Sequence, residues 1–155
     1  MRKVVFVCTG NTCRSSMAEG LFKKMLEQEE KQKDFRVESC GIAAIDGDPA
    51  SLYAKKVMKD EGVDISSHIA RLMTYELLKS ADLILTMTKS HKDYILKKYP
   101  DLKGRVFLIS EFACEQNDCK NLDIEDPFGG SEQDYRNVKD QIKDKLYAVL
   151  NRLKN

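Results

Sequence analysis

The sequence predicts an α/β protein of three layers, in which a four-stranded parallel sheet lies between helices. Four short segments rich in apolar and β-branched residues are separated by longer segments whose apolar residues recur every three or four positions. The chain has 155 residues, of which 42% are hydrophobic and 33% are charged. That length and balance suit one domain, residues 1–155, with a substantial core.

The first half of the chain is expected to form two strands and two helices. In order, these are a buried strand over residues 3–8, a helix over 14–32, a strand over 35–39, and a helix that is capped by Asp48-Pro49 and ends at Gly62. The first strand is indicated by its β-branched content. The first helix places Met17, Leu21, Met25 and Leu26 on one face. The second is indicated by a cap residue followed by proline.

The second half continues the alternation. It is expected to contain a short helix capped by Thr74, a strand over 82–87, a helix with a capping box from Ser90 to Asp93 that ends before Pro100, a strand over 105–109, and a long helix from Ser131. The long helix carries an apolar stripe of Tyr135, Val138, Ile142, Leu146, Leu150 and Leu153. Ligands bind beyond the carboxyl ends of parallel strands, so the segments after residues 8, 39, 87 and 109 should share one rim.

The segment that joins the first strand to the first helix has the composition of a phosphate-binding loop. Residues 8–15 read Cys-Thr-Gly-Asn-Thr-Cys-Arg-Ser. Gly10 and Asn11 tolerate left-handed backbone geometry, so successive N–H groups can curl around an anion. The helix start adds free N–H donors, and Arg14 adds a planar fork. We therefore expect phosphate to be bound by Thr9, Gly10, Asn11, Thr12, Cys13, Arg14 and Ser15.

Cys8 gives this loop a reactive group that simple phosphate binding does not need. It lies at the floor of the expected bowl, where the local field should favour its thiolate. Taken alone, a cysteine that ends a buried strand is usually a small core residue. The loop lacks the Gly-Lys-Ser/Thr ending of nucleotide-binding loops, so hydrolysis of ATP or GTP is not expected.

Attack by a thiolate also needs an acid for the leaving group and a base for water, and one carboxyl group can serve both in turn. The best candidate is Asp126, which opens the sequence Asp-Pro-Phe-Gly-Gly, a loop rather than a helix. Phe128 in that loop is placed to form one wall of a pocket. The spacing leaves Asp123 and Glu125 as competing candidates, and an Asp-Pro pair in such a turn is often only a cap.

With these residues in view, the sequence resembles the low-molecular-weight protein tyrosine phosphatase family over essentially its whole length. The resemblance rests on residues 8–15, on Ser39-Cys40-Gly41, on His68-x-Ala70-Arg71 and on Asp126-Pro127. It implies a four-stranded parallel sheet with flanking helices.

The resemblance also implies roles for individual residues. Cys8 would be the nucleophile, Arg14 the phosphate clamp, and Asp126 the general acid and then the base. Ser15 would hydrogen-bond the thiolate, and the loop would be braced by Asn11, Ser39 and His68. Neither a cofactor nor a metal is implied.

Two departures bear on the substrate. Thr12 stands where tyrosine-directed members usually carry a larger aliphatic residue, and no aromatic residue follows Gly41. In these features, and in the Asp-Pro-Phe-Gly-Gly-Ser stretch, the chain looks like the bacterial branch that removes phosphate from arginine. Asp126 could pair with the guanidinium group as well as protonate it. Phosphoarginine is therefore the favoured substrate and phosphotyrosine the alternative; Thr12 could also be a neutral replacement.

The five cysteines form no disulfide framework, and their odd number favours free thiols in a reducing cytoplasm. Cys114 and Cys119 are expected to be loop thiols, and without a neighbouring histidine they do not suggest a zinc site. The resemblance gives Cys13 two compatible interpretations. It could form a reversible disulfide that protects Cys8, or it could pack beneath the loop.

Other features are interpreted conservatively. His91 lies on a predicted helix near the rim but is expected on the surface, and Cys40 is expected in the core. Tyr135 is expected at the core edge, with the pocket rim as the alternative. An arsenate reductase would need shuttle cysteines within residues 86–91, which contain none, and a phosphocysteine carrier would not need both Arg14 and an acid. The net charge of +1 does not favour nucleic-acid or membrane partners. We expect a cytoplasmic monomer acting on phosphorylated proteins.

Overall fold

The computed structural model describes residues 1–114 and 122–154 and contains the predicted parallel sheet. Its strands are β1 (Arg2–Cys8), β2 (Phe35–Gly41), β3 (Leu83–Thr86) and β4 (Val106–Leu108), in the spatial order β2-β1-β3-β4. Every neighbouring pair is parallel, with Val5 opposite Glu38 on one side and Ile84 on the other. All four carboxyl ends therefore lie at one edge, which confirms the expected rim.

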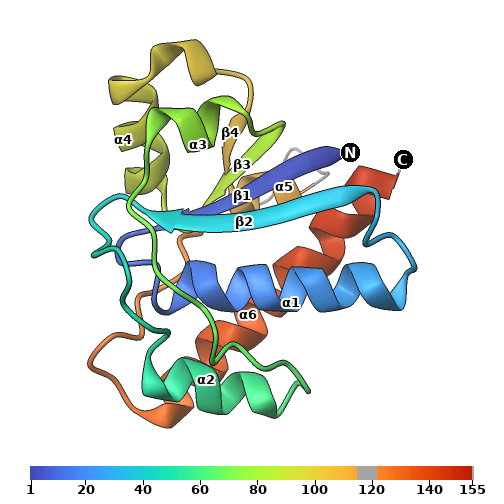
Figure 1. Cartoon of the computed structure of the whole chain (residues 1–155), viewed down its shortest axis with the longest axis vertical. Coiled ribbons are helices and arrows are strands. Elements are labelled where there is room, and N and C mark those ends of the chain that lie inside the picture. The colour runs from blue at the N-terminus through green and yellow to red at the C-terminus, as the bar shows by residue number, and fades with distance from the viewer. Residues whose placement is uncertain (115–121, 155) are drawn as a thin grey trace.

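Helices cover both faces of this sheet (Figure 1). On one face lie α1 (Arg14–Gln28), α2 (Leu52–Lys59), α5 (Ile109–Ala113) and α6 (Glu132–Lys154); on the other lie α3 (Tyr75–Lys79), α4 (Lys89–Lys98) and the short 3-10 turn η1 (Pro100–Leu102). In the part of the chain that the structure describes, no helix is both long enough and apolar enough to cross a membrane.

Strand β1 separates two apolar clusters because its side chains alternate between the faces of the sheet. Val4 and Phe6 belong to the cluster under α1 and α6, whereas Val5 and Val7 belong to the cluster under α3 and α4. Phe6 meets Phe22 of α1 edge-on, with ring centroids 5.7 Å apart. The central strand and the first helix are thus fixed to each other by core packing, and so is the loop between them.

Several predicted boundaries are wrong, each for a local reason. Helix α1 ends at Gln28 rather than at residue 32, because Glu30 adopts a left-handed φ of 56° and closes the helix. Asp48 does not cap α2, because Pro49 lies opposite Ile69 in an isolated antiparallel bridge and the cap is Ser51. Helix α5 and η1 were not predicted; both are short, and neither has the length needed for a clear periodic signal.

Candidate active site

The phosphate-binding loop leaves the carboxyl end of β1 at the rim of the sheet and turns directly into α1. Asn11 is completely buried and has a φ of 58°, so the left-handed geometry expected of the loop is found at this residue and not at Gly10. Cys13 occupies the N-cap position of α1 but makes no side-chain capping bond. The first turn of the helix therefore keeps backbone donors for an anion.

The Cys8 thiol lies buried at the base of this loop, with 2% of its surface exposed. Its Sγ is 2.8 Å from Ser15 Oγ and accepts a hydrogen bond of 3.3 Å from the Asn11 backbone N–H. Burial raises the pKa of Cys8 above its ordinary value, against the opposing effects of the Ser15 and Asn11 hydrogen bonds and of the Arg14 charge. The expectation that the local field favours the Cys8 thiolate is therefore wrong for this structure, because desolvation outweighs the hydrogen bonds and the Arg14 charge.

Arg14 links the loop to the segment that carries the predicted acid. Its Nη1 donates a bond of 2.9 Å to the carbonyl oxygen of Ile124, whose own N–H donates 2.9 Å to the carbonyl of Met87 just beyond β3. Its Nη2 lies 3.6 Å from Asp126 Oδ2 and 3.4 Å from Thr9 Oγ1. The guanidinium group is buried, so its direction is set by these neighbours.

A pocket of about 260 Å³ opens above Cys8. It is lined by Cys8, Thr9, Gly10, Thr12, Cys13, Arg14, Ala43, Ile45, Asp48, Asp126 and Phe128. The structure thus brings the thiol, the arginine and the carboxylate of the sequence prediction to one cavity. Asn11 and Ser15 do not line it; they lie behind the loop.

Among the three competing carboxylates, only Asp126 lines this pocket. Asp123 Oδ1 instead accepts a bond of 2.8 Å from the Lys89 N–H, and Glu125 lines two other hollows. Asp126 Oδ1 accepts a bond of 3.1 Å from the Phe128 N–H, while half of its side chain remains exposed. Phe128 is 76% exposed, so it forms an open wall rather than a closed slot.

Asn11 is the centre of the contacts that hold the loop. Its Nδ2 donates to Ser15 Oγ at 2.7 Å and to Ser39 Oγ at 2.9 Å, and its Oδ1 accepts 3.0 Å from the Arg71 backbone N–H. Its carbonyl oxygen accepts 2.7 Å from His68 Nε2. The structure therefore brings together Asn11, Ser15, Ser39 and His68, as the resemblance implied.

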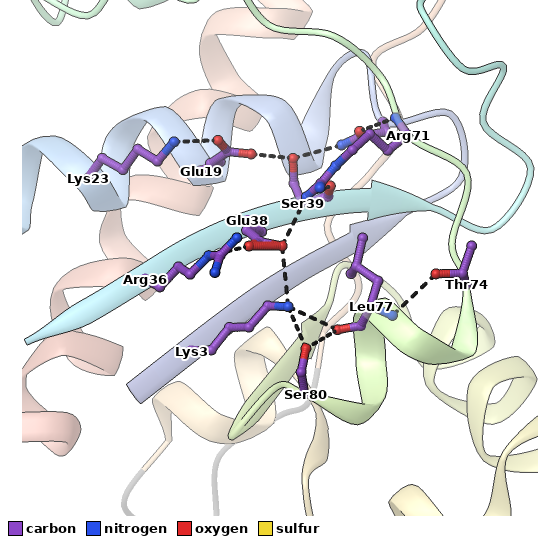
Figure 2. Close-up of polar contacts among 11 residues, drawn as sticks. Lys3, Glu19, Lys23, Arg36, Glu38, Ser39, Arg71, Thr74, Leu77 and Ser80 are labelled. Atoms are coloured by element: carbon purple, nitrogen blue, oxygen red, sulfur yellow. Dashed lines mark hydrogen bonds and ion pairs between the residues drawn. The ribbon is translucent and has the colours of Figure 1, made fainter. Parts of the chain in front are cut away.

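This network continues outward to the edge of the sheet (Figure 2). Ser39 Oγ donates 2.6 Å to Glu19 Oε1 on α1, and Arg71 Nη2 lies 3.2 Å from Glu38 Oε1 on β2. Glu38 also lies 3.3 Å from Lys3 Nζ on β1. Sequence reasoning missed the contributions of Glu19 and Arg71, because both depend on contacts between distant segments.

Gly41 is required by the close approach of the loop to the end of β2. A Cβ at this position would lie against the backbone carbonyl of Thr9, 2.9 Å from the Asn11 nitrogen and 3.0 Å from the Ala44 Cβ. Backbone atoms cannot move aside as a flexible side chain can. The absence of a side chain at Gly41 therefore allows the loop and the segment after β2 to pack together.

His91 contradicts its expected surface position. It is the third residue of α4, only 4% of its surface is exposed, and its Nε2 lies 2.9 Å from Thr9 Oγ1. The predicted capping box from Ser90 to Asp93 is also wrong: the box is formed by Thr88 and His91. Burial, followed by the Arg14 charge, lowers the pKa of His91 to about 4.

The cysteines divide into free and bonded groups. Cys8, Cys13 and Cys40 are free and buried, so the prediction of free thiols holds for them. It is wrong for Cys114, which is disulfide-bonded, while Cys119 lies outside the described residues. Cys13 Sγ lies 3.3 Å from Tyr135 Oη and 3.4 Å from Ser51 Oγ.

Tyr135 is 3% exposed and is therefore a core residue in contact with the loop. Burial, with the Cys13 contact, raises its pKa to about 12, so its hydroxyl stays protonated near neutral pH. Burial likewise raises the pKa of Cys40 to about 12, as suits a packing residue. Within residues 1–114 and 122–154, no three histidine, cysteine or acidic side chains gather to bind a metal ion.

Comparison with known proteins relates both the fold and the loop to one family. Residues 3–155 match the family model described as low molecular weight phosphotyrosine protein phosphatase. The chain is 35% identical to the protein-arginine-phosphatase of Bacillus subtilis (strain 168), over 97% of this chain and 96% of that protein. It is 39% identical to the low molecular weight protein-tyrosine-phosphatase PtpB of Staphylococcus haemolyticus, over 95% of this chain and 94% of that one.

Solved structures agree with this relationship. A YwlE arginine phosphatase, a cysteine-to-serine mutant with a phosphorylated active-site serine, matches with a TM-score of 0.92. Its sequence is 34% identical, and the match covers 99% of this chain and 96% of that one.

Proposed function

The chain belongs to the low molecular weight phosphotyrosine protein phosphatase family, and from this we propose that it hydrolyses phosphoarginine in proteins through a phosphorylated Cys8. As a family member it is a hydrolase that removes phosphate from phosphorylated proteins. The specific proposal rests on one observation: Cys8, Arg14 and Asp126 line the same pocket, and Asp48 is a second acidic residue in its lining.

In the first step, the phosphoryl group enters the loop and the Arg14 fork holds two of its oxygens. The Cys8 thiol gives its proton to an oxygen of the bound phosphoryl dianion, and the resulting thiolate attacks phosphorus, so an S–P bond forms as the bond from phosphorus to the leaving nitrogen breaks. Asp126 gives its proton to that nitrogen, and the arginine side chain departs as the guanidinium cation. Loop N–H groups and Arg14 stabilise the negative charge on the equatorial oxygens in the transition state.

In the second step, water replaces the sulfur. Asp126, now a carboxylate, accepts a proton from the water as its oxygen attacks phosphorus. The S–P bond breaks, and the electron pair returns to Cys8 as a thiolate. Ser15 Oγ, 2.8 Å from the sulfur, donates a hydrogen bond that stabilises this leaving thiolate.

The pocket wall supports a cationic leaving group over a phenol. Asp48 and Asp126 both line it. The guanidinium group remains charged at neutral pH, so the Asp48 carboxylate attracts it, while Asp126, protonated as the acid, donates to its leaving nitrogen. A neutral phenol ring gains nothing from this charge and finds one aromatic residue in the lining, the exposed Phe128. Thr12 adds a short, polar side chain at the rim, where a longer aliphatic residue would favour a ring.

Phosphotyrosine is the second candidate substrate. The relative from Staphylococcus haemolyticus is named a tyrosine phosphatase and shares as much of this chain as the arginine-directed relative does. Overall identity therefore does not separate the two substrates, and the preference for phosphoarginine is supported by the chemistry of the pocket wall.

The test compares two peptides that are identical except for phosphoarginine or phosphotyrosine. We expect the parent protein to have the higher kcat/KM for phosphoarginine. Thr12→Ile should move the ratio toward phosphotyrosine by about tenfold, of the order that a changed hydrophobic contact provides, whereas Thr12→Ser, which keeps the hydroxyl, should not. A parent that prefers phosphotyrosine, with a ratio that Thr12→Ile leaves unchanged, would contradict the substrate assignment.

The covalent intermediate has its own test. Rapid acid-free quenching followed by mass spectrometry should find the phosphoryl group on Cys8, and Cys8→Ser should abolish turnover. An adduct on another residue would contradict the nucleophile assignment.

We also infer the setting in which the enzyme acts. Residues 1–155 form one phosphatase domain that works as a cytoplasmic monomer on phosphorylated proteins. The net charge of +1 gives no general attraction to nucleic acid or to acidic membranes.

A further inference from the structure

We propose that His91 is a positioning residue for phosphate binding: as a neutral ring with its proton on Nε2, it directs the Thr9 hydroxyl proton into the pocket and supports Arg14. This inference rests on the proposed site but not on the identity of the phosphorylated side chain. The mechanism above makes no use of His91, although its ring lies beside the phosphate-binding loop.

The hydrogen bonds of the ring determine its tautomer. The Thr88 backbone N–H donates 3.2 Å to His91 Nδ1, so Nδ1 must carry a lone pair. In a neutral imidazole the proton then resides on Nε2. Nε2, which is 2.9 Å from Thr9 Oγ1, is therefore the donor, and the Thr9 oxygen is the acceptor.

The position of the ring is itself fixed by α4. The His91 backbone N–H donates 3.1 Å to Thr88 Oγ1, while the Thr88 N–H donates to the ring. These two bonds form the reciprocal capping box at the helix N-terminus. Because β3 lies next to β1 in the sheet, the helix start after β3 faces the loop after β1. The sheet order thus places the Nε2–H opposite Thr9.

The consequence concerns the Thr9 hydroxyl. A hydroxyl oxygen has two acceptor positions and one proton. Thr9 Oγ1 accepts from His91 Nε2 and, at 3.4 Å, from Arg14 Nη2. With both acceptor positions used, the remaining capacity of Thr9 is to donate. Thr9 lines the pocket, so its proton is available to a phosphate oxygen.

The neutral state of the ring is part of the same arrangement. Arg14 on α1 and the carboxylates of Asp123 and Asp126 before α6 are the charges that act on it. Burial and Arg14 dominate and lower its pKa, so the ring stays neutral at physiological pH. A protonated ring would lose the bond from the Thr88 N–H, because Nδ1 would no longer accept.

Two substitutions distinguish the contribution of the His91 Nε2 hydrogen bond from that of the Nδ1 hydrogen bond. His91→Gln places an amide N–H near the position of Nε2 and should keep donation to Thr9. His91→Asn places its amide oxygen near Nδ1, so it should keep the cap at Thr88 but not reach Thr9. Both variants replace the ring by an uncharged amide that does not titrate. Each is therefore a matched control for the other with respect to the loss of the ring and to charge.

The measurement is inhibition by inorganic phosphate, together with kcat and KM for p-nitrophenyl phosphate. We expect His91→Asn to weaken phosphate binding and raise KM about three- to tenfold, the range of one hydrogen bond, with a smaller effect on kcat. His91→Gln should restore most of the affinity. In a Thr9→Val background, His91→Asn should add nothing, since the shared partner is gone. Equal effects of Asn and Gln, or full additivity with Thr9→Val, would overturn the proposal.

A second measurement needs no variant. Nitrogen NMR of the histidine rings in the native protein should show one buried ring with a protonated Nε2 and an unprotonated Nδ1 at pH 7. The opposite tautomer would overturn the proposal. Because inorganic phosphate and an aryl phosphate serve as probes, these results stand whichever phosphorylated side chain is the natural substrate. If Cys8→Ser retained turnover, the proposed mechanism would fail while the phosphate-binding result would remain.

Discussion

Replacement of Asp126 by asparagine separates proton transfer from the other effects of this residue. Asparagine has the same shape and keeps an Oδ1 acceptor for the Phe128 N–H, which is bonded at 3.1 Å, so the loop should retain its position. The substitution also removes the ion pair with Arg14, in which Asp126 Oδ2 lies 3.6 Å from Arg14 Nη2 and the Asp126 side chain is half exposed. Such an ion pair contributes at most about 1 kcal/mol, or about fivefold in phosphate affinity.

Loss of the proton donor has a far larger expected effect. General acid catalysis contributes about 10²- to 10⁴-fold in rate, or roughly 3 to 5 kcal/mol of transition-state stabilisation. This loss should appear fully for phosphotyrosine, whose phenol has a pKa near ~10 and departs poorly without a proton. It should be small for p-nitrophenyl phosphate, whose product leaves readily as an anion.

The assay is kcat for Asp126→Asn on phosphotyrosine, phosphoarginine and p-nitrophenyl phosphate, with phosphate inhibition measured in parallel. We expect phosphate inhibition to change by less than about fivefold, while the two poor leaving groups lose at least about a hundredfold. Glu125→Gln, which changes a carboxylate outside the pocket lining, is the matched control. A loss of equal size for all three substrates would refute the assignment of Asp126 as the acid.

Three further predictions follow from individual contacts. Gly41→Ala should weaken inorganic phosphate binding more than tenfold, because its Cβ would meet the Thr9 carbonyl; unchanged phosphate inhibition would show that the loop adapts. Ser15→Ala should raise the pKa of Cys8 further, and the pH profile of alkylation by iodoacetamide would shift upward; no shift would exclude the hydroxyl as a donor to sulfur. His91 has a pKa of about 4 in the folded protein and about 6.5 in the unfolded chain, so the unfolded chain binds a proton first as the pH falls. The free energy of unfolding should therefore be unaffected by His91 above pH 6.5. It should decrease by about 2 kcal/mol, after allowance for solvent screening, as the pH drops toward 4. Urea unfolding of the parent and His91→Gln would measure this, and the variant should lack that part of the pH dependence.

The sequence could predict the parts of the site that are contiguous. Residues 8–15 contain the nucleophile, the loop and the arginine in one stretch, and a strand before them and a helix after them are enough to orient the loop. The alternation of strands and helices likewise predicts a parallel sheet, because a crossover helix forces the next strand to run in the same direction.

The sequence could not predict contacts that depend on strand order. The sequence predicts His91 on a helix near the rim and favours an exposed position, because a polar residue in the first turn of a helix usually faces solvent. Its burial follows from the position of β3 beside β1, which puts the start of α4 against the Thr9 side chain. Arg71 is a similar case: its backbone N–H meets Asn11 from 60 residues away, and no local pattern signals this.

The hydroxyl groups of Ser15, Ser39 and Thr9 around the loop each accept a hydrogen bond from a side-chain N–H. Such a bond orients the proton of the hydroxyl group. Asn11 Nδ2 donates to Ser15 and Ser39, and its orientation is fixed because its Oδ1 accepts from the Arg71 N–H. Ser39 then donates to Glu19, and the Ser15 hydroxyl proton is free to point to the Cys8 sulfur, 2.8 Å from Ser15 Oγ.

The pair of His91 and Thr9 acts in the same way on the other side of the loop. In each case an upstream N–H fills an acceptor position of the hydroxyl, and the hydroxyl proton points away from it: from Ser15 toward the Cys8 sulfur, from Ser39 toward Glu19, and from Thr9 toward the pocket. Removal of a hydroxyl deletes a donor, whereas removal of the upstream N–H only lets the hydroxyl rotate. Substitutions at Ser15 or Thr9 should therefore reduce phosphate chemistry more than substitutions at the residues that orient them.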